Sequence, residues 1–552
     1  MVVAPVMDAP AFPLTWQDPT EAEVTWLRDP MHFPRPLSPL FRSVWGPAFE
    51  FGFSTAAREL SMPVLGVRVR FHNGYEYEHH DIAEPASEDE AREMGARTEA
   101  AMREAIGRQM DRWQGEFLPR LLKTRDRLRT VDVAQASPTQ VVALIDEVDE
   151  IAREDWLIHF RIAFPMMLAM ELYDEFYAEL FGSDAANAHA LLVGQSSKSV
   201  AAGIGLSQLA TYARENGLKD AVLSQPAEEV LASIEGTKEG GVLANKIRTY
   251  LDEFGLRQDL FDFITPTWQE DPSIAIATIQ AYLQSGHDTA AEHEASVRKA
   301  EAALTTAREG LVGYPEPVRG QFEGMVQAAR VAYFLQEEHN FYIDQQGIAL
   351  MRLFFLRLGE RLVSEGKLDR PDDVFMLTRD EIKATVSEDF NARAAAAAGW
   401  AELDRQRALT APPFVGAPPA GPPPTDNPML RANVRFFGGP PQQADAPNQL
   451  KGNAGSRGTA RGVARVALTL DDAKWLQPGE ILVTLTTMPA WTPLFGTAAA
   501  VVTETGGPLS HCAIVAREYA IPAVVGAFGA TRAIQTGQTI LVDGDRGLVT
   551  LE

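Results

Sequence analysis

One stretch decides the fold of the carboxyl-terminal part of this chain: Thr503-Glu504-Thr505-Gly506-Gly507-Pro508-Leu509-Ser510-His511-Cys512-Ala513-Ile514-Val515. The apolar run that leads into it, residues 498–502, predicts a short buried strand, and the paired glycines permit backbone angles that other residues resist. Ser510 is a suitable N-cap for a helix that begins at His511. The sequence therefore predicts a strand, a glycine turn and a helix with a histidine in its first turn.

The position of His511 suits a phosphoryl group. A helix begins with unpaired N–H groups and the positive end of its dipole, and both favour a negative charge. The same field favours the neutral ring, which is the nucleophilic form of histidine. The alternative is a structural histidine in an ordinary strand–turn–helix unit, because a glycine turn before a helix is a weak signal.

These residues resemble the swivelling phosphohistidine domain of phosphoenolpyruvate synthase and pyruvate phosphate dikinase. In that family the matched histidine carries a phosphoryl group between two distant sites, which implies this role for His511. The family usually has alanine or glycine where this chain has Cys512. The resemblance extends through residues 458–464, 478–483, 521–526 and 542–544.

Neighbours of the histidine are expected to serve the phosphoryl group. Thr505 and Ser510 would hydrogen bond to its oxygens, and Gly506 and Gly507 would let the backbone come close to it. Arg517 lies further along the helix, where it would balance charge or dock the domain.

Composition indicates a cytoplasmic enzyme subunit with several domains. The chain has 552 residues, of which 45% are hydrophobic and 23% charged, and its formal charge of -25 argues against nucleic acid or an anionic membrane as a partner. Its single cysteine excludes an internal disulfide framework, and we interpret that residue as helix packing. No apolar run approaches the length of a membrane span or a secretory signal.

Proline and glycine mark a domain boundary. They are concentrated in residues 411–425 and, more loosely, 438–455, where they favour an extended connector. We predict a mainly helical acceptor-binding domain over residues 1–405, a linker over 406–450 and the phosphohistidine domain over 451–552. The linker would let the last domain travel; the alternative is a passive spacer or surface loop.

The fold class expected is multidomain α and α/β. Residues 63–77 alternate and turn at Asn73-Gly74, which predicts a small β element near the start of the helical domain. Apolar residues recur at helical spacing elsewhere. This pattern predicts helices over residues 87–128, 139–164, 184–214, 274–283, 289–311 and 321–365.

The helical part resembles the acceptor-binding part of rifampicin phosphotransferase and its relatives. Taken together, the acceptor part and the histidine domain are most similar to the large subunit of phenylphosphate synthase and of the related enzymes that phosphorylate 4-cresol. Those enzymes keep the ATP-grasp module on a separate subunit. The motifs that carry this resemblance are residues 29–40, Asn73-Gly74-Tyr75, residues 254–257, residues 266–272 and residues 372–378.

The nucleotide is expected on another protein. Full-length relatives begin with an ATP-grasp domain and often end with a barrel that binds phosphoenolpyruvate, and this chain stops soon after the histidine domain. Its first part also lacks a glycine-rich, lysine-bearing nucleotide loop. We therefore expect ATP and Mg²⁺ on a separate ATP-grasp subunit, and we find no metal-ligand spacing in this chain itself.

Three residues are candidates for the acceptor site. A phenol has a pKa of about 10 and is easier to deprotonate than an alcohol, so one nearby base suffices. His339 is the leading base, with a buried structural histidine as the equal alternative, and His159 has a similar apolar setting. Arg257 would neutralise the phosphate charge, or would pair with Asp259 or Asp262, the commoner fate of an arginine.

Other histidines and aromatic residues have simpler interpretations. His32 and the pair His79-His80 are expected in surface loops. Two aromatic clusters suit a flat acceptor, but core packing is the favoured interpretation. These clusters are Trp45, Phe49, Phe51 and Phe53, and Trp156, Phe160 and Phe164.

The sequence thus predicts a phosphotransferase in which His511 receives a phosphoryl group from an ATP-grasp partner and passes it to a small phenolic hydroxyl. One alternative is transfer to an antibiotic, a sugar or a carboxylic acid. Another is a phosphocarrier that delivers the group to a second protein.

Overall fold

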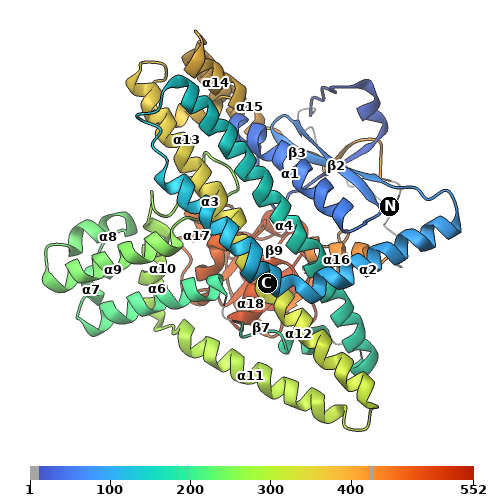
Figure 1. Cartoon of the computed structure of the whole chain (residues 1–552). Helices are drawn as coiled ribbons and strands as arrows, with labels where there is room; N and C mark the ends of the chain where they lie inside the picture. Colours follow the sequence, from blue (N-terminus) through green and yellow to red (C-terminus); the bar gives the residue numbers. More distant parts are fainter. Residues whose placement is uncertain (1–11, 183–184, 196, 420, 422–426) are drawn as a thin grey trace. The chain divides into compact units, whose positions relative to one another are not determined.

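The structure is a computed structural model that describes residues 12–182, 185–195, 197–419, 421 and 427–552. The chain forms two compact units, each assembled from separated segments (Figure 1). Unit 1 comprises Met1–Ile162, Leu260–Thr265 and Gln346–Pro422, and unit 2 comprises Ala163–Asp259, Pro266–Gln345 and Pro423–Glu552. The predicted division into residues 1–405, 406–450 and 451–552 stays a prediction, since the compact units follow contacts and not sequence order.

Unit 1 contains a four-stranded antiparallel sheet in the order β2-β3-β1-β4. Its hairpin confirms the predicted β element, because β2 and β3 are joined at Asn73-Gly74, where both residues have positive φ. The helix α1 packs on this hairpin (Figure 1). The bounds are β1 Thr25–Arg28, α1 Pro39–Glu59, β2 Val64–His72, β3 Tyr75–Ile82 and β4 Phe414–Gly416.

The aromatic residues of unit 1 form a core, as favoured from the sequence. Trp45 and Trp156 meet edge to face at 5.7 Å, and Phe49 and Phe160 do so at 5.1 Å, so α1 packs closely on the first part of α4. The other helices of unit 1 are η1 Pro19–Glu23, α2 Glu88–Arg112, η2 Trp113–Phe117, α3 Leu118–Thr130, α13 Gln346–Ser364, η4 Pro371–Met376, α14 Arg379–Ser387 and α15 Ala392–Arg407.

Unit 2 contains an eight-stranded sheet in the order β5-β12-β11-β7-β8-β9-β10-β6. Strands β7, β8, β9 and β10 are parallel to their neighbours within this run, and the remaining pairings are antiparallel. Its strands are β5 Gln449–Lys451, β6 Asn453–Ser456, β7 Thr459–Val466, β8 Ile481–Thr484, β9 Ala500–Thr503, β10 Ala523–Val525, β11 Thr539–Asp543 and β12 Leu548–Leu551.

Fully buried aliphatic side chains of the parallel strands form the core of this sheet, among them Ile481, Val502 and Val524. Helix α18 packs beside it (Figure 1). The short helices that accompany the sheet are α16 Pro428–Phe437, α17 Leu470–Ala473, η5 Pro489–Gly496, α18 His511–Glu518 and α19 Ala530–Ala533. The predicted β/α architecture of the carboxyl-terminal part is therefore present.

Helices make up the rest of unit 2. The long helix α4 Pro138–Phe181 belongs to both units, and only its part after Ile162 lies in unit 2. The others are α5 Ala185–Ala190, α6 Lys198–Glu215, α7 Lys219–Leu223, α8 Ala227–Ile234, α9 Lys238–Phe254, α10 Ser273–Ser285, α11 Thr289–Gly310, α12 Glu316–His339 and the π-helical turn η3 Asn340–Gln345.

Some expectations need correction. His79 and His80 lie in strand β3 and not in a surface loop, because the hairpin continues to Ile82. The helix predicted over residues 184–214 is interrupted, since α5 ends at Ala190 and α6 begins at Lys198, and residue 184 lies outside the described residues. The stretch predicted as a linker includes β4 and α16, and its residues 420 and 422–426 also lie outside the described residues.

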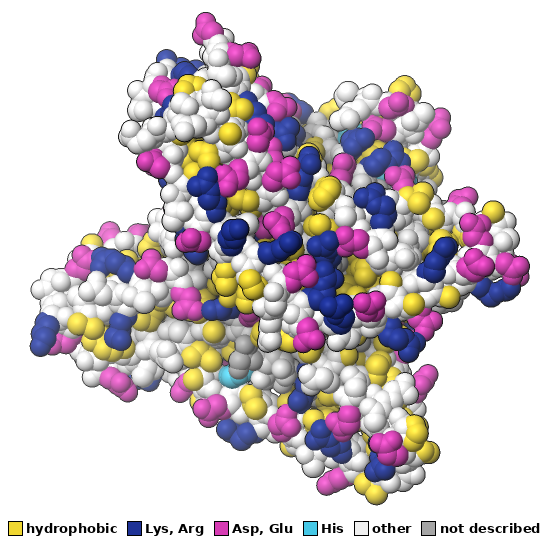
Figure 2. All heavy atoms as spheres, in the orientation of Figure 1, with side chains coloured by type: hydrophobic (Ala, Val, Ile, Leu, Met, Phe, Trp, Pro, Cys, Tyr) yellow, Lys and Arg dark blue, Asp and Glu magenta, His cyan; other side chains and the backbone are white. Residues whose placement is uncertain are grey.

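The charged surface is mixed in sign. Figure 2 shows Lys and Arg side chains lying among Asp and Glu side chains on the displayed face. Among the described helices, none combines the length and the apolar character needed to cross a lipid bilayer.

Candidate functional site

The site lies at the carboxyl ends of two neighbouring parallel strands of unit 2. Strand β8 leads into η5, which carries Thr492, and strand β9 leads through the glycine turn into α18, which begins at His511. Since parallel strands place their carboxyl ends at one edge of a sheet, residues that follow β8 and β9 meet there. The sequence prediction of a strand, a turn and a helix that begins at His511 is confirmed.

Both ring nitrogens of His511 have partners of different kinds. Nδ1 lies 3.0 Å from Oε1 of Glu337, which comes from α12, and Nε2 lies 3.3 Å from the hydroxyl of Thr492. A carboxylate can only accept hydrogen bonds, so Nδ1 carries the ring proton and donates a hydrogen bond to Glu337. The lone pair therefore lies on Nε2, where the Thr492 hydroxyl donates to it, and Nε2 is the nucleophilic atom.

Glu337 is a buried carboxylate held in its charged form. Burial alone would raise the pKa of Glu337, but the neighbouring His511 and the hydrogen bonds from His511 and Ser199 hold it below its usual value. Its second oxygen, Oε2, has no hydrogen-bond partner among the residues that the structure describes. The carboxylate can thus stabilise a positive charge on the imidazole ring.

The glycine turn is shaped by its own backbone. Gly506 has φ +96°, in the left-handed region that favours glycine. A side chain at Gly507 would place Cβ 2.1 Å from the carbonyl oxygen of Arg435, and the Gly507 N–H donates to the carbonyl of Phe436 at 3.0 Å. Gly507 is thus needed for close packing against α16, and its N–H is already bonded.

The two hydroxyls expected to hold the phosphoryl group differ. The Thr505 hydroxyl donates to the carbonyl of Leu485 at 3.1 Å, so its proton is engaged in the turn. The Ser510 hydroxyl makes no capping bond to α18, and within the described part of the chain it has no hydrogen-bond partner although Ser510 is buried. Ser510 therefore retains a hydroxyl that a phosphoryl oxygen can use.

Helix α16 fixes the turn to the helical part of unit 2. The Leu509 N–H donates to the carbonyl of Arg435 at 2.9 Å. The side chain of Arg435 forms ion pairs with Asp174 at 3.0 Å and with Glu171 at 3.2 Å, both on α4. Arg431 adds a second pair with Glu171 at 2.8 Å. This helix lies within the predicted linker, so that segment contacts the site.

Arg517 and Glu518 lie at the end of α18, where Arg517 is partly buried and Glu518 is buried. Arg517 donates to the carbonyl of Pro508, and this bond links the end of α18 to the glycine turn. Glu518 accepts the N–H of Gly194 with both oxygens, at 3.0 and 3.1 Å. Burial raises the pKa of Glu518 to about 8, against hydrogen bonds from Gly194 and Tyr333 that act in the opposite direction. A docking role was expected for Arg517, but it is the neighbouring Glu518 that bonds to the helical part of unit 2, through the N–H of Gly194.

A small cavity lies beside Glu337 and Thr492. It has room for about one water-sized molecule, which is too little for an aromatic acceptor. The cavity is lined by Gln195, Ser197, Ser199, Val200, Tyr333, Glu337, Thr492, Ile514, Val515, Glu518 and Tyr519.

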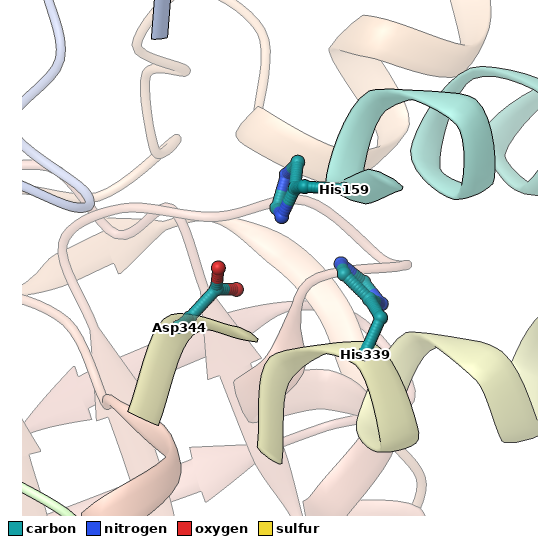
Figure 3. A group of neighbouring side chains, drawn as sticks. All are labelled: His159, His339 and Asp344. Atoms are coloured by element: carbon teal, nitrogen blue, oxygen red, sulfur yellow. The ribbon is translucent and has the colours of Figure 1, made fainter. Parts of the chain in front are cut away.

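The candidates for the acceptor site fall in different places. His339 ends α12, is buried, and its Nδ1 lies 2.6 Å from the carbonyl oxygen of Leu335, so Nδ1 donates and Nε2 is the basic atom. Figure 3 shows His339 at the end of that helix and Asp344 on the turn η3 that follows it. His159, drawn in the same figure, belongs to α4 in unit 1, where its ring lies 4.7 Å from Trp156.

Arg257 lies in unit 2 and is fully buried. The pairing with Asp259 or Asp262 is not made, because all three guanidinium nitrogens of Arg257 are without a hydrogen-bond partner among the described residues. Its guanidinium group instead lies over the rings of Trp268 and Phe341.

Sequence reasoning missed Glu337 and Thr492. Glu337 stands two positions before the candidate base His339 in an acidic, partly aromatic segment, but nothing in the sequence connects α12 with a histidine 174 positions further along the chain. Thr492 comes from a stretch of prolines and apolar residues without a recognisable motif. Only the pairing of β8 with β9 brings Thr492 to the site.

Cys512 is buried, as the helix-packing interpretation requires, and burial raises the pKa of its thiol to about 12.

Comparisons with known proteins identify two regions. Residues 476–547 match the family described as PEP-utilising enzyme, mobile domain, and residues 159–337 match the rifampicin phosphotransferase fourth domain. The first match contains the glycine turn and His511, and the second ends at Glu337. The contact between His511 and Glu337 therefore joins the two matched regions.

Similar proteins span most of this chain. It is 35% identical to chondramide synthase cmdD of Chondromyces crocatus over 98% of this chain and 14% of that protein. It is 28% identical to the uncharacterized phosphotransferase YvkC of Bacillus subtilis over 96% of this chain and 62% of that protein. A rifampicin phosphotransferase of Streptomyces sviceus is 30% identical over 58% of this chain and 35% of its own length.

The chain thus carries a region similar to the mobile domain of PEP-utilising enzymes and a helical region similar to the rifampicin phosphotransferase fourth domain. It spans less than two thirds of the length of each of these three relatives.

Proposed function

We propose that this chain is a phosphotransferase subunit. His511 receives a phosphoryl group from a separate ATP-grasp protein and passes it to the hydroxyl of a small, phenol-like acceptor, which leaves as an aryl phosphate. One observation carries the proposal: a histidine at the start of a helix has Nδ1 bound to a buried carboxylate and Nε2 directed to a hydroxyl. The names of the relatives YvkC and rifampicin phosphotransferase support phosphoryl transfer.

In the first transfer, Nε2 of His511 attacks phosphorus, and the bond to the leaving oxygen of the donor breaks with its electron pair. The ring then carries phosphorus on Nε2 and a proton on Nδ1, and its positive charge is balanced by Glu337. Ser510 donates a hydrogen bond to a phosphoryl oxygen. ATP and its Mg²⁺ ion belong to the donor protein in this proposal.

In the second transfer, the acceptor oxygen attacks phosphorus and the bond from phosphorus to Nε2 breaks, which returns the electron pair to Nε2. The proton of the acceptor hydroxyl passes to a base, for which we propose Nε2 of His339. A positively charged phosphoimidazole is a better leaving group than a neutral one, so Glu337 supports both transfers. His159, the second histidine considered as the base, belongs to unit 1, where its ring packs against Trp156.

The domain has to move between the two transfers. The cavity beside Glu337 holds about one water-sized molecule, so donor and acceptor need separate access to Nε2. The proline-rich residues before β5 provide a connector for this movement.

The test uses the full chain, an ATP-grasp donor, labelled ATP and a panel of phenols. We expect label on His511 of the native chain and then in an aryl phosphate, no label on His511→Ala, and native behaviour of His32→Gln, which removes a histidine from unit 1. Potassium phosphoramidate, which phosphorylates histidine without an enzyme, serves as a second donor. A native chain that stays unlabelled with both donors contradicts the proposal.

A larger hydroxylated molecule is the second candidate acceptor, because the matched helical region is named for a rifampicin phosphotransferase. Adding such compounds to the phenol panel separates the two acceptors. A labelled protein product and no labelled small molecule would instead support a phosphocarrier.

A further inference from the structure

The strongest unexplained feature of unit 2 is the buried charge of Arg257. Its side chain has 0% exposure, and each of its three guanidinium nitrogens is without a hydrogen-bond partner in the described part of the chain. Arginine keeps its charge in proteins, so burial leaves a cation without its hydration shell. An unpaired buried charge is costly and is rarely retained without a counter-charge.

Aromatic rings orient this side chain but do not neutralise it. The guanidinium carbon lies 5.2 Å from the centre of the Trp268 ring and 5.9 Å from that of Phe341. Such contacts provide no hydrogen-bond acceptor and no counter-charge. The N–H groups of the guanidinium group are thus held by the two rings and remain available to a hydrogen-bond acceptor.

Nearby carboxylates are already engaged. Asp259, two positions along the chain, accepts the indole N–H of Trp491 at 2.9 Å and the N–H of Leu470 at 3.0 Å. Glu338 accepts the N–H of Lys198 at 2.8 Å. Glu337 accepts from His511. None of these acids hydrogen bonds to the guanidinium group among the described residues, and Oε2 of Glu337 has no hydrogen-bond partner there.

The segment of Arg257 contacts the element that bears on His511. Asp259, two positions along the chain, accepts the indole N–H of Trp491, and the next residue, Thr492, lies 3.3 Å from Nε2 of His511. Burial lowers the pKa of Arg257, whereas Tyr250, Tyr519 and Glu337 raise it. Glu337 and Tyr519 both line the cavity. The Tyr250 hydroxyl, on α9, has no hydrogen-bond partner among the described residues, so a second donor lies near the same guanidinium group.

We propose that Arg257 binds the phosphoryl group that His511 delivers. The inference rests on the proposed function and identifies the group that balances the charge of the phosphoryl oxygens while the bond to Nε2 breaks and the bond to the acceptor oxygen forms. A planar guanidinium binds two phosphoryl oxygens at once, which suits a trigonal phosphoryl group in transfer. The cation is preformed and buried, so it needs no reorganisation during the reaction.

Three variants of the full chain test this inference. Arg257→Met removes the charge, Arg257→Lys keeps it without the planar donor pair, and Arg248→Met removes a half-exposed arginine of α9 that pairs with Glu235 at the surface. Circular dichroism and thermal unfolding establish that each variant is folded. Arg257→Met leaves no hydrogen-bond partner unpaired among the described residues, so we expect this variant to fold.

The first measurement is binding of inorganic phosphate by titration calorimetry, which requires neither a donor nor an acceptor. We expect the native chain and Arg248→Met to bind phosphate equally, Arg257→Lys to bind more weakly, and Arg257→Met to bind at least about 10-fold more weakly. No binding to the native chain, or equal binding to Arg257→Met, overturns the inference.

The second measurement follows phosphoryl transfer from chains labelled with phosphoramidate. We expect Arg257→Met to gain the label on His511. It should lose the label to a phenol about 100- to 1,000-fold more slowly than the native chain, which is the typical effect of removing one hydrogen-bond donor to the transition state of an enzyme. Transfer at the native rate overturns the inference. If the native chain gains no label on His511, the proposed function fails, while phosphate binding still reports separately on Arg257.

Discussion

Two arginines with 0% exposure, one in each unit, show opposite ways of burying a charge. In unit 1, Arg125 forms a two-pronged pair with Asp155 at 2.8 and 3.1 Å and also donates to the Thr124 hydroxyl. In unit 2, no nitrogen of Arg257 has a hydrogen-bond partner among the described residues. The first arrangement is complete without a ligand, and the second is not.

The same contrast holds for two serines that precede helices. Ser38 of unit 1 accepts the N–H of Phe41 and bonds to Asp262 at 2.5 Å, whereas Ser510 of unit 2 makes no capping bond. Buried polar groups without partners are costly, so Ser510, Arg257 and Oε2 of Glu337 are groups that a ligand could satisfy. Arg125 and Ser38 of unit 1, in contrast, have partners within the fold.

The largest effect is expected from Arg125→Met. It leaves the buried Asp155 carboxylate without its partner, a change that typically costs about 3–5 kcal/mol. Arg257→Met removes a charge that has no partner to orphan, so its unfolding temperature should stay within a few degrees of the native value. Thermal unfolding of both variants measures the difference. Equal losses would show that Arg257 has an internal partner and would break the comparison.

Next in size is Glu337→Ala, which removes the acceptor of the Nδ1 proton. We expect phosphoramidate to label native His511 on Nε2 alone, and Glu337→Ala to be labelled about 100-fold more slowly, with part of the phosphorus on Nδ1. Phosphorus NMR distinguishes the two isomers, and loss of packing alone would not change their ratio. Exclusive labelling of Nε2 in this variant would show that Glu337 does not select the nitrogen.

The serine pair gives a smaller effect that sharpens the comparison. Ser38→Ala removes a helix cap and a bond to a buried carboxylate, and we expect a loss of about 1–2 kcal/mol in unfolding free energy. Ser510→Ala removes a hydroxyl without a partner, so we expect stability close to native and slower labelling of His511. Chemical denaturation and the labelling rate are the two measurements. A stability loss in Ser510→Ala equal to that in Ser38→Ala would contradict the assigned difference.

The smallest effect is a pH dependence from Glu518. Burial raises the pKa of Glu518 from 4.5 to about 8, so the folded chain holds a proton there that the unfolded chain has released. Its contribution to stability is full below pH 4.5 and is lost as the pH rises to about 8. We expect the native unfolding temperature to fall by a few degrees between pH 6 and pH 9 relative to Glu518→Gln, which stays neutral. Parallel curves for the two chains would refute this assignment.

Local sequence determined the carboxyl-terminal element that contains His511. Strand β9, the turn at Gly506 and the start of α18 at His511 were predictable from short-range signals, namely an apolar run and a glycine turn. Ser510 occupies the N-cap position as predicted, but its hydroxyl makes no capping bond. The hairpin at Asn73 was predictable for the same reason, because turn residues and alternation act within a few positions. His79 and His80 were misplaced because their strand lacks apolar alternation and is specified by pairing with β2.

Tertiary structure alone decided which groups face His511. Glu337 and Thr492 reach the ring from distant segments, and α16 was hidden in a proline-rich stretch whose helix is fixed by ion pairs with α4. Whether Arg257 would find a partner was also undecided by sequence, since Asp259 beside it binds Trp491 instead. Turns and caps depend on neighbouring residues, whereas the pairing of buried charges depends on which segments the folded chain brings together.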